Sequence, residues 1–380
     1  MKSFFPKFKE PKKEGLSTTW LQSFMRRHNL KTLLAHKTEA ARIQYSCINL
    51  LQPWHENILT PALEDVPPCL IFNMDETMVQ FGARVRVVCS QTSKRVLTQS
   101  SEINEHITAV CCISATGKKL IPFMIYQLKT SSKSLIERVE QNLMTIGGQS
   151  SGWIDRNLFC CWVQWFIEQV QLIRTINKQE DKRAVLILDS HPSRKAPSAL
   201  KMLKSNNIDV ITLVAHTSGV AQPLDVAIFG GLKTILARKY RKLLLKTQKK
   251  KKKDSFTKQQ KRICMTDAFL HSWDAAATSL NILSGFEATG IYPLDFTKLK
   301  NNENVAEGGL TPEEVKSKAS KKRVRIDSTL LTGRNMISML EEKKTLMSKK
   351  QRSEKTKKKK KKRSKHHHKK KTKTKTTISN

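Results

Sequence analysis

The chain has 380 residues, with 70 Lys and Arg against 32 Asp and Glu, and a formal net charge of +38. An excess of this size repels itself and indicates a polyanionic partner, with DNA as the leading candidate. No stretch approaches the ~20 apolar residues of a membrane span, and the basic N-terminal segment lacks the apolar run of a secretory signal. These features disfavour a membrane protein and a secreted protein.

The eight cysteines include no CxxC pair. Cys111–Cys112 and Cys160–Cys161 are adjacent and lie in apolar runs, where cysteines are more often buried small side chains than metal ligands. We therefore expect a reduced intracellular protein without structural zinc.

The N-terminal region is basic and carries one helical pattern. Residues 1–15 are rich in Lys and Pro, and we expect them to be disordered. The next stretch, "LSTTWLQSFMRRHNL", predicts a helix capped by Ser17 or Thr18. Two interpretations stay open: a short surface helix, or part of a helix-turn-helix in which Arg26 and Arg27 contact DNA phosphates.

From about residue 69 the pattern changes to short β-rich runs and then alternates between strands and helices. The expected strands are 69–74, 85–90, 107–114, 119–126, 184–189 and 209–215, and the expected helices are 155–174, 196–207 and 223–247. Strands in hairpin order followed by alternating strands and helices predict an α/β fold, a mixed sheet with helices on both faces.

The C-terminal third is increasingly basic. A lysine run at 246–255 predicts a solvated break before a helical patch at 263–280, and "TPEE" predicts a capping box that opens a short helix near 312–320. We expect most of 297–380 to be disordered, since residues 351–380 hold 15 Lys or Arg and one acid, a net of +14. This tail and the cations of "KKRVR" predict DNA contacts and nuclear localisation; the four cations are Lys321, Lys322, Arg323 and Arg325.

Three carboxylates stand at the ends of predicted elements. Asp75 follows the apolar run "IFNM", and Asp189 follows the continuous apolar run "AVLIL". Asp225 lies in the first turn of the helix that Pro223 opens, on one stripe with Phe229 and later apolar residues. Converging carboxylates repel each other unless cations bridge them, so the set predicts a Mg²⁺ or Mn²⁺ site for phosphodiester chemistry. Each acid alone is more often a turn or capping residue.

At these residues the chain resembles the pogo/Tigger/Jerky branch of DDE-superfamily transposases, which includes centromere protein B. "MDET", "LILDSHPS" and "AHTSGVAQPLDVAIFGGLK" resemble the three acidic motifs of that branch. "EHITAVCCISATGKKLIPFMIY", "SSGWIDRNLFCCWVQWFI" and "ILSGFEATGIYPLD" resemble the segments between and after them. The resemblance covers about residues 16–296.

The resemblance implies an RNase H-like fold and a catalytic, metal-binding triad of Asp75, Asp189 and Asp225. It implies Mg²⁺- or Mn²⁺-dependent cleavage and strand transfer at transposon ends, and it leaves room for a homo-oligomer assembled on DNA. The second motif usually reads Asp-Asn-His with another His, whereas this chain has "DSHPSR". His191 and His216 flank the expected site as accessory candidates, although a loop histidine without such a role is commoner.

These expectations divide the chain into four parts: a disordered basic leader (1–15), a partial helix-turn-helix remnant (16–50), a DDE catalytic domain (65–296) and a tail (297–380). Little more than one helix of the paired DNA-binding region precedes Asp75, so we expect weak sequence preference and no autonomous transposition. The leading hypothesis is a DNA-binding DDE/D endonuclease derived from a transposon. The alternative is a domesticated DNA- or chromatin-binding protein that keeps the fold without catalysis.

Overall fold

The computed structural model describes residues 18–28, 40–80, 106–127, 133–251, 257–311 and 314. The chain separates into two units, Met1–Ala40 and Ala41–Asn380. The first unit contains α1 (Thr18–Arg27), on which the rings of Trp20 and Phe24 stack with their centroids 5.2 Å apart. The predicted N-terminal helix is therefore present.

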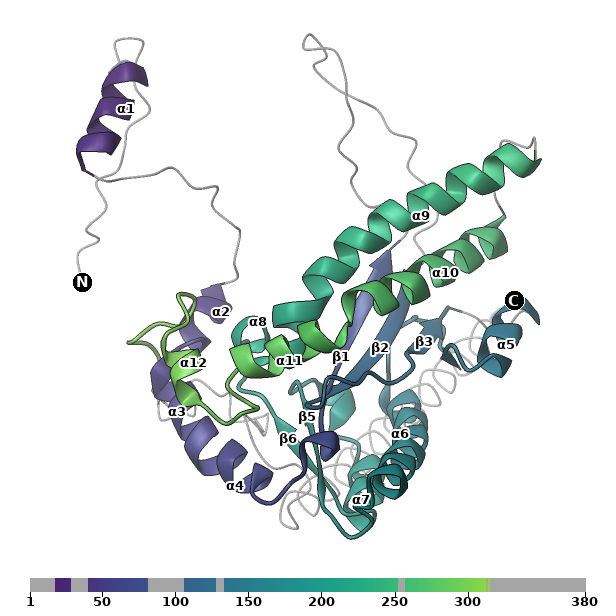
Figure 1. Ribbon diagram of the computed structural model, residues 1–380, viewed down its shortest axis with the longest axis horizontal. Helices are drawn as coiled ribbons and strands as arrows, with labels where there is room; N and C mark the ends of the chain where they lie inside the picture. The colour runs from purple at the N-terminus through teal and green to yellow at the C-terminus, as the bar shows by residue number, and fades with distance from the viewer. Residues whose placement is uncertain are drawn as a thin grey trace, which may run out of the picture. The chain divides into compact units, whose positions relative to one another are not determined.

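The second unit is built on a six-stranded sheet with the order β4-β3-β2-β1-β5-β6 (Figure 1). The strands are β1 (Ile71–Gln80), β2 (His106–Ser114), β3 (Phe123–Tyr126), β4 (Thr145–Gly148), β5 (Ala184–Leu188) and β6 (Ile208–Thr212). β1, β2 and β3 pair antiparallel, whereas β5 is parallel to both β1 and β6, and β4 is parallel to β3. An antiparallel meander joined to parallel strands is the RNase H-like arrangement, and the predicted mixed sheet is confirmed.

One face of the sheet is covered by α6 (Arg156–Asn177) and α7 (Pro197–Ser205). Asp155 caps α6 by accepting a hydrogen bond from the backbone N–H of Leu158 at 2.8 Å. The ring of Phe72 on β1 meets the edge of Phe166 on α6, with centroids 5.2 Å apart. The apolar side chains that made 155–174 a predicted helix thus pack onto this face.

The opposite face carries α8 (Ser218–Ala221), the π-helix η4 (Leu224–Ile228), α9 (Phe229–Lys251), α10 (Lys258–Ala276) and α11 (Ser279–Ala288). Tyr126 on β3 shares a 2.7 Å hydrogen bond with Thr266 on α10. The stripe predicted for the long helix is buried here, since Phe229, Leu232 and Leu236 are at most 8% exposed. The result is a three-layer α/β/α unit, as the strand and helix pattern predicts.

Short helices flank the sheet: α2 (Ala40–Tyr45), α3 (Ile48–Trp54), η1 (His55–Leu59), α4 (Thr60–Leu63), η2 (Pro68–Leu70), α5 (Lys133–Glu140), η3 (Pro192–Arg194) and α12 (Phe296–Lys300). The indole of Trp54 donates to the carbonyl oxygen of Thr212 at the end of β6, at 3.0 Å. Cys47 pairs with Ala306 in an isolated bridge, and Leu310 is buried. Residues 47–54 and 305–310 therefore belong to the unit that contains the sheet.

Several elements differ from the sequence-based expectations. β1 does not end before the acids but continues through them to Gln80. The 119–126 strand is shorter than expected, and β4, α5 and the helices between residues 40 and 63 were not predicted. α9 extends to Lys251, past its predicted end, because lysine itself favours helix. The expected strand 85–90 and the leader 1–15 lie outside the described residues, as does the 312–320 helix except Glu314.

The capping box predicted at "TPEE" is confirmed. The backbone N–H of Thr311 donates to the carboxylate of Glu314 at 2.9 Å, and the backbone N–H of Glu314 donates to the hydroxyl of Thr311 at 3.3 Å. The two reciprocal bonds satisfy donors that a helix start leaves unpaired.

Gly285 sets the distance between α11 and η4. A Cβ added at this position would lie 3.0 Å from the carbonyl oxygen of Pro223 and 3.1 Å from Cβ of Ala227, whereas one at Gly230 on α9 would meet nothing within 4 Å. We expect Gly285→Ala to destabilise the fold by about 1–3 kcal/mol through overpacking. Gly230→Ala, the matched control, should stabilise by roughly 0.5–1 kcal/mol, because alanine favours helix over glycine. Urea unfolding of both variants measures this; equal effects would contradict the close-packing argument.

Candidate active site

β1 directs its two acids to opposite faces of the sheet. Successive side chains of a strand alternate between faces. Phe72 packs on α6, and the amide of Asn73 accepts a hydrogen bond from the backbone N–H of Leu224 in η4. By the same alternation, Asp75 lies on the η4 face and Glu76 on the α6 face. The two adjacent carboxylates therefore have different neighbours and different roles.

Asn73 joins the three elements that carry the predicted triad. It is fully buried, and its amide nitrogen donates to the carbonyl oxygen of Ile187 on β5 at 3.1 Å. Its amide oxygen accepts from the N–H of Leu224, also at 3.1 Å. These partners lie two residues before Asp189 and one residue before Asp225, and Asn73 itself precedes the first acid by two. One side chain thus fixes the relative positions of three acids that are far apart in sequence.

Asp225 lies in a π-helical turn instead of the regular helix start that Pro223 predicted. η4 covers Leu224–Ile228, and the N–H of Phe229 bonds back to the carbonyl oxygen of Leu224. Such single π-turns inside helices are uncommon and are frequent at functional sites. The turn is held by the Asn73 bond at its first residue, and Asp225 remains partly buried beside the sheet.

The electrostatics show that the three acids are neighbours. Burial raises the pKa of Asp75 well above its ordinary value, and the charges of Asp225, Asp189 and Glu76 raise it further, while Arg194 acts in the opposite direction. A carboxylate is destabilised in this way when other carboxylates lie close and water is excluded. The predicted convergence of Asp75, Asp189 and Asp225 at one place is thus a property of the fold, while their assignment as metal ligands stays a prediction.

A buried guanidinium lies at the edge of this acidic cluster. Arg194 is 0% exposed, and it donates one hydrogen bond to Glu76 at 2.7 Å and a second, shorter one to the other carboxylate oxygen. Its Nε lies 3.3 Å from Oδ1 of Asp189, and its charge lies over the ring of Phe159, 5.5 Å from the centroid. Burial acts to lower the pKa of Arg194, but Glu76 and Asp189 overcome this and raise it.

Sequence reasoning missed both Arg194 and Asn73. For Arg194 the sequence holds no signal, because an arginine in a loop after Pro192 is ordinarily exposed. For Asn73 there was one: an amide inside the apolar run "CLIFNM" must find partners, since burying it unpaired is costly. Glu76, the acid that follows Asp75, is the partner of the buried guanidinium.

The two accessory histidines have local partners. Nδ1 of His191 lies 2.8 Å from the hydroxyl of Ser193 and accepts from the Ser193 N–H, so this side chain caps the short helix η3. His216 has a left-handed backbone, with φ of 63°, and its ring lies against Tyr45 with centroids 5.1 Å apart. These contacts account for both side chains structurally, and their accessory role in chemistry stays a prediction.

The predicted DNA-contacting residues lie away from this cluster in the sequence. Arg26 and Arg27 are exposed in the last turn of α1, within the first unit. The four cations of "KKRVR" and the lysine-rich tail lie outside the described residues. Their role in DNA binding is therefore unchanged as a prediction.

The donor set suits a hard divalent cation. Both amide atoms of Gln222, three residues before Asp225, are buried without a hydrogen bond from any described residue. Buried polar atoms without partners are rare and mark sites for water or an ion. Within the described residues, however, no three His, Cys, Asp or Glu side chains already have the spacing of a shared metal site. The carboxylates would have to turn toward a cation when it binds.

Comparison with known proteins identifies a family of similar domains. Residues 104–286 match the family described as DDE superfamily endonuclease. The chain is 26% identical over 213 residues to the human Jerky protein homolog, covering 55% of this chain and 36% of that protein. The part of the chain that matches is thus similar to a DDE endonuclease domain. More narrowly, the chain is similar to the pogo/Tigger/Jerky-like, transposase-derived proteins, and the resemblance inferred from its motifs is confirmed.

A second relative has a different name. The chain is 25% identical over 227 residues to the MFS-type transporter clz9 of Cochliobolus lunatus, covering 59% of this chain and 23% of that protein. None of the described helices combines the length and apolar content that a membrane crossing requires. Because the chain matches about a third or less of either relative, the activity of those whole proteins does not transfer to it directly.

Solved structures of Mos1 transposase are also similar. A pre-cleavage Mos1 transpososome matches with a TM-score of 0.48 and 12% identity, covering 76% of this chain and 72% of that one. The Mos1 catalytic domain with Raltegravir and Mn matches with a TM-score of 0.41 and 12% identity, covering 70% of this chain and 94% of that one.

The raised pKa of Asp75 means that this carboxyl makes the folded protein less stable at neutral pH than at acidic pH. A folded-state pKa above the ordinary value means that the folded protein binds more protons, so this carboxyl costs stability as pH rises from about 4 through its folded pKa. With metal ions removed by a chelator, the Asp75→Asn variant should therefore be more stable than the wild type at neutral pH. The difference in free energy of unfolding between the two proteins should shrink toward pH 4. Urea unfolding at a series of pH values measures it. A less stable variant at neutral pH would contradict the crowding of charges.

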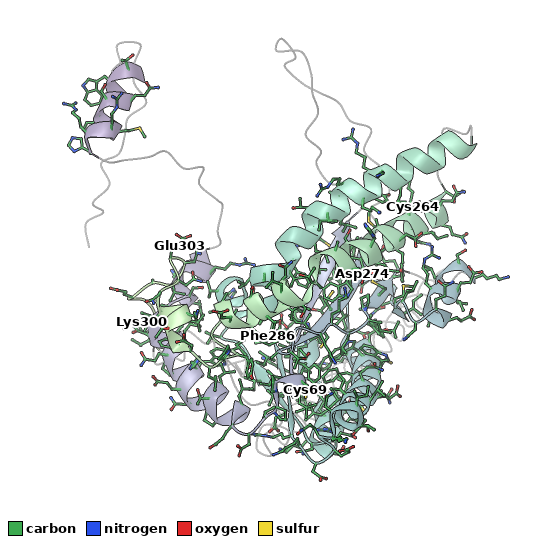
Figure 2. All side chains as sticks on the ribbon, viewed as in Figure 1. Cys69, Cys264, Asp274, Phe286, Lys300 and Glu303 are labelled. Carbon is green, nitrogen blue, oxygen red and sulfur yellow. The ribbon has the colours of Figure 1, made fainter. Side chains whose placement is uncertain are left out.

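Breaking the buried ion pairs of Arg194 should reduce the free energy of unfolding far more than breaking a surface ion pair. We expect Arg194→Met to destabilise the fold by about 3–5 kcal/mol, because Glu76 is left without its buried partner. The control is Lys119→Met, which breaks the ion pair with Asp274, a residue labelled in Figure 2. Because the side chain of Asp274 is 73% exposed, losing this pair should cost about 0–1 kcal/mol. Adding Glu76→Gln to Arg194→Met should restore part of the loss. If the double variant instead loses the sum of the stability losses of the two single variants in denaturant unfolding, the two side chains are not coupled.

Proposed function

We propose that this chain is a transposon-derived, DNA-binding DDE/D endonuclease that cleaves phosphodiester bonds at Asp75, Asp189 and Asp225 with Mg²⁺ or Mn²⁺. The observation that carries the proposal is the crowding of three carboxylates, on three separate elements, in a domain that matches the DDE superfamily endonucleases. The formal charge of +38 supports a nucleic-acid substrate.

The chain's own residues supply position and charge. Asp75 and Asp225 would hold a cation from the η4 face, and Asp189 from the end of β5, with Asn73 keeping the three in register. Divalent ions bound there would stabilise the attacking and leaving oxygens of the phosphodiester. Arg194 holds Glu76 on the far face, so this fourth acid does not enter the ligand set. The basic surface attracts the phosphate backbone of the substrate.

One observation favours the alternative, a DNA-binding protein that keeps the fold without catalysis. Arg194 places a fixed positive charge 3.3 Å from Asp189, and a guanidinium there can neutralise part of the charge that a metal ion would otherwise neutralise. The departures in "DSHPSR" lie in this same loop. The two functions differ in metal binding and in cleavage, so one set of measurements separates them.

We also propose that the protein acts in the nucleus. The basic segment at 321–325 and the tail with its net charge of +14 are the candidate import signals. The same tail should add to DNA affinity without reading sequence, because lysines displace counterions from phosphates instead of recognising bases.

The decisive experiment measures metal binding and cleavage in the same protein. Millimolar Mn²⁺ or Mg²⁺ should raise the thermal stability of the wild type, by about 2.7 kcal/mol at a hundred times the dissociation constant, and should permit nicking of plasmid DNA. Asp189→Asn and Asp225→Asn should remove both effects. Asp274→Asn, which changes an exposed carboxylate on α10, should leave both intact.

The outcomes separate the two functions. A thermal shift and nicking that both need the triad acids support the nuclease. A wild type that binds DNA but shows no shift at millimolar metal supports the non-catalytic alternative.

A further inference from the structure

The helices α9 and α10 form an antiparallel pair that extends past the sheet (Figure 1). α9 follows η4 without a break, so the helix that leaves the candidate active site continues into this pair. Burial raises the pKa of Tyr240, and Cys264 on α10 raises it further, which places these two side chains next to each other across the pair. We call the outer part of the pair, 238–251 with 258–262, the basic arm; Figure 2 labels Cys264 just inside it.

The basic arm has an extreme charge. Residues 226–266 contain 14 Lys or Arg and a single acid, Asp254. The two acids that follow on α10 are used elsewhere: Asp267 pairs with Arg138 at 2.6 Å, and Asp274 pairs with Lys119 at 2.8 Å. Both pairs fasten the inner half of α10 to the rest of the unit. The positive charge of the outer half is left uncompensated by them.

Three cations of the arm share one exposed face. Arg238, Arg241 and Lys242 are spaced three and four residues apart, on the side of α9 opposite its buried apolar stripe. None of the three forms an ion pair with a residue that the structure describes. Like charges at this spacing destabilise a helix. One alternative is that these cations only keep the surface soluble, as a solvated lysine run would. That alternative does not explain why two of the three are arginines or why the helix face that carries them has no acid.

The position of this face fits a duplex that passes through the active site. At 1.5 Å per residue, Arg238 and Lys242 lie about 20–25 Å along the helix from Asp225. Successive phosphates of one DNA strand are about 3.4 Å apart along the duplex axis, so this distance corresponds to roughly six to eight phosphates. The three cations are therefore placed to hold DNA that flanks the reacting bond.

We propose that the exposed face of α9 formed by Arg238, Arg241 and Lys242 is a phosphate-binding surface for duplex DNA flanking the cleavage site. The inference deepens the function proposed above and rests on its DNA-binding part. An anionic membrane surface is a poorer match, because membrane-surface helices need a large apolar face beside the basic one. Here the neighbouring exposed positions are Gly230, Gly231, Thr234 and Ala237.

The test compares two variants of the full chain that lose the same charge. The arm variant is Arg238→Gln, Arg241→Gln and Lys242→Gln. The control variant is Lys178→Gln, Lys182→Gln and Lys300→Gln, three exposed cations outside the arm, of which Figure 2 labels Lys300 on α12. Binding to a random duplex of about 30 base pairs, two to three turns of DNA, is measured by fluorescence anisotropy in EDTA over a range of salt. Glutamine favours helix nearly as well as arginine and lysine, and circular dichroism checks that both variants fold.

The arm variant should lose about two to three units from the slope of log K against log salt, close to 0.9 for each phosphate contact removed. The control variant should lose less than about one unit. Equal losses in the two variants would overturn the proposal, as would a wild-type slope in the arm variant. A variant that loses binding to phosphatidylserine vesicles but keeps its DNA slope would assign the face to a membrane instead.

The measurement is independent of catalysis, because no metal is present. A wild type that never nicks DNA, together with a reduced slope in the arm variant, would reject the nuclease and keep the arm. If the arm variant keeps both metal-dependent nicking and the wild-type salt slope, the nuclease proposal stands and the arm proposal is rejected.

Discussion

The candidate site depends on one buried amide. Asn73 bonds to β5 and η4 from β1, so the three elements that carry Asp75, Asp189 and Asp225 share a single fixed point. Parallel pairing of β1 with β5 already places Asn73 opposite Ile187. The Asn73 side chain then bonds to η4, which the strand pairing alone would not position. Because a buried amide is costly unless it is paired on both sides, the same bonds that fix the acids also resist any slip of η4 along the strand.

Gathering acids at this point creates an electrostatic cost that the fold offsets only in part. Strand alternation turns Glu76 away from the other acids, and Arg194 compensates it from the α6 side. Asp75 has no such ion-pair partner among the residues that the structure describes: burial raises the pKa of its carboxyl, and the charges of Asp225 and Asp189 raise it further. A cluster of this kind is stabilised by protonation or by a bound cation, and stabilisation by a cation is the physical basis of the metal site proposed above. The fixed charge of Arg194 decides how much of that attraction is left for the metal.

The sequence was sufficient for the parts of the fold that rest on periodicity. The continuous run at 184–188 predicted a strand buried on both faces, and the stripe from Asp225 to Leu236 predicted the side on which the long helix packs. It failed where tertiary contacts decide. The strand through Asp75 and Glu76 continues because β2 pairs with it along its whole length, which no local propensity reveals. The π-turn at Asp225 and the burial of Arg194 likewise depend on partners more than a hundred residues away in sequence.

The continuity of η4 and α9 gives these local features a common consequence. A helix transmits a displacement along its axis with little loss, because its backbone bonds fix each residue to the next turn. Gly285 brings α11 against the start of this helix, Asn73 bonds to its first residue, and the pair of α9 with α10 holds its outer half. Asp225 is therefore at the fixed end of a rigid rod whose other end is strongly basic. DNA bound along that rod would reach the three carboxylates in one register, set by helix length and not by recognition of a base sequence.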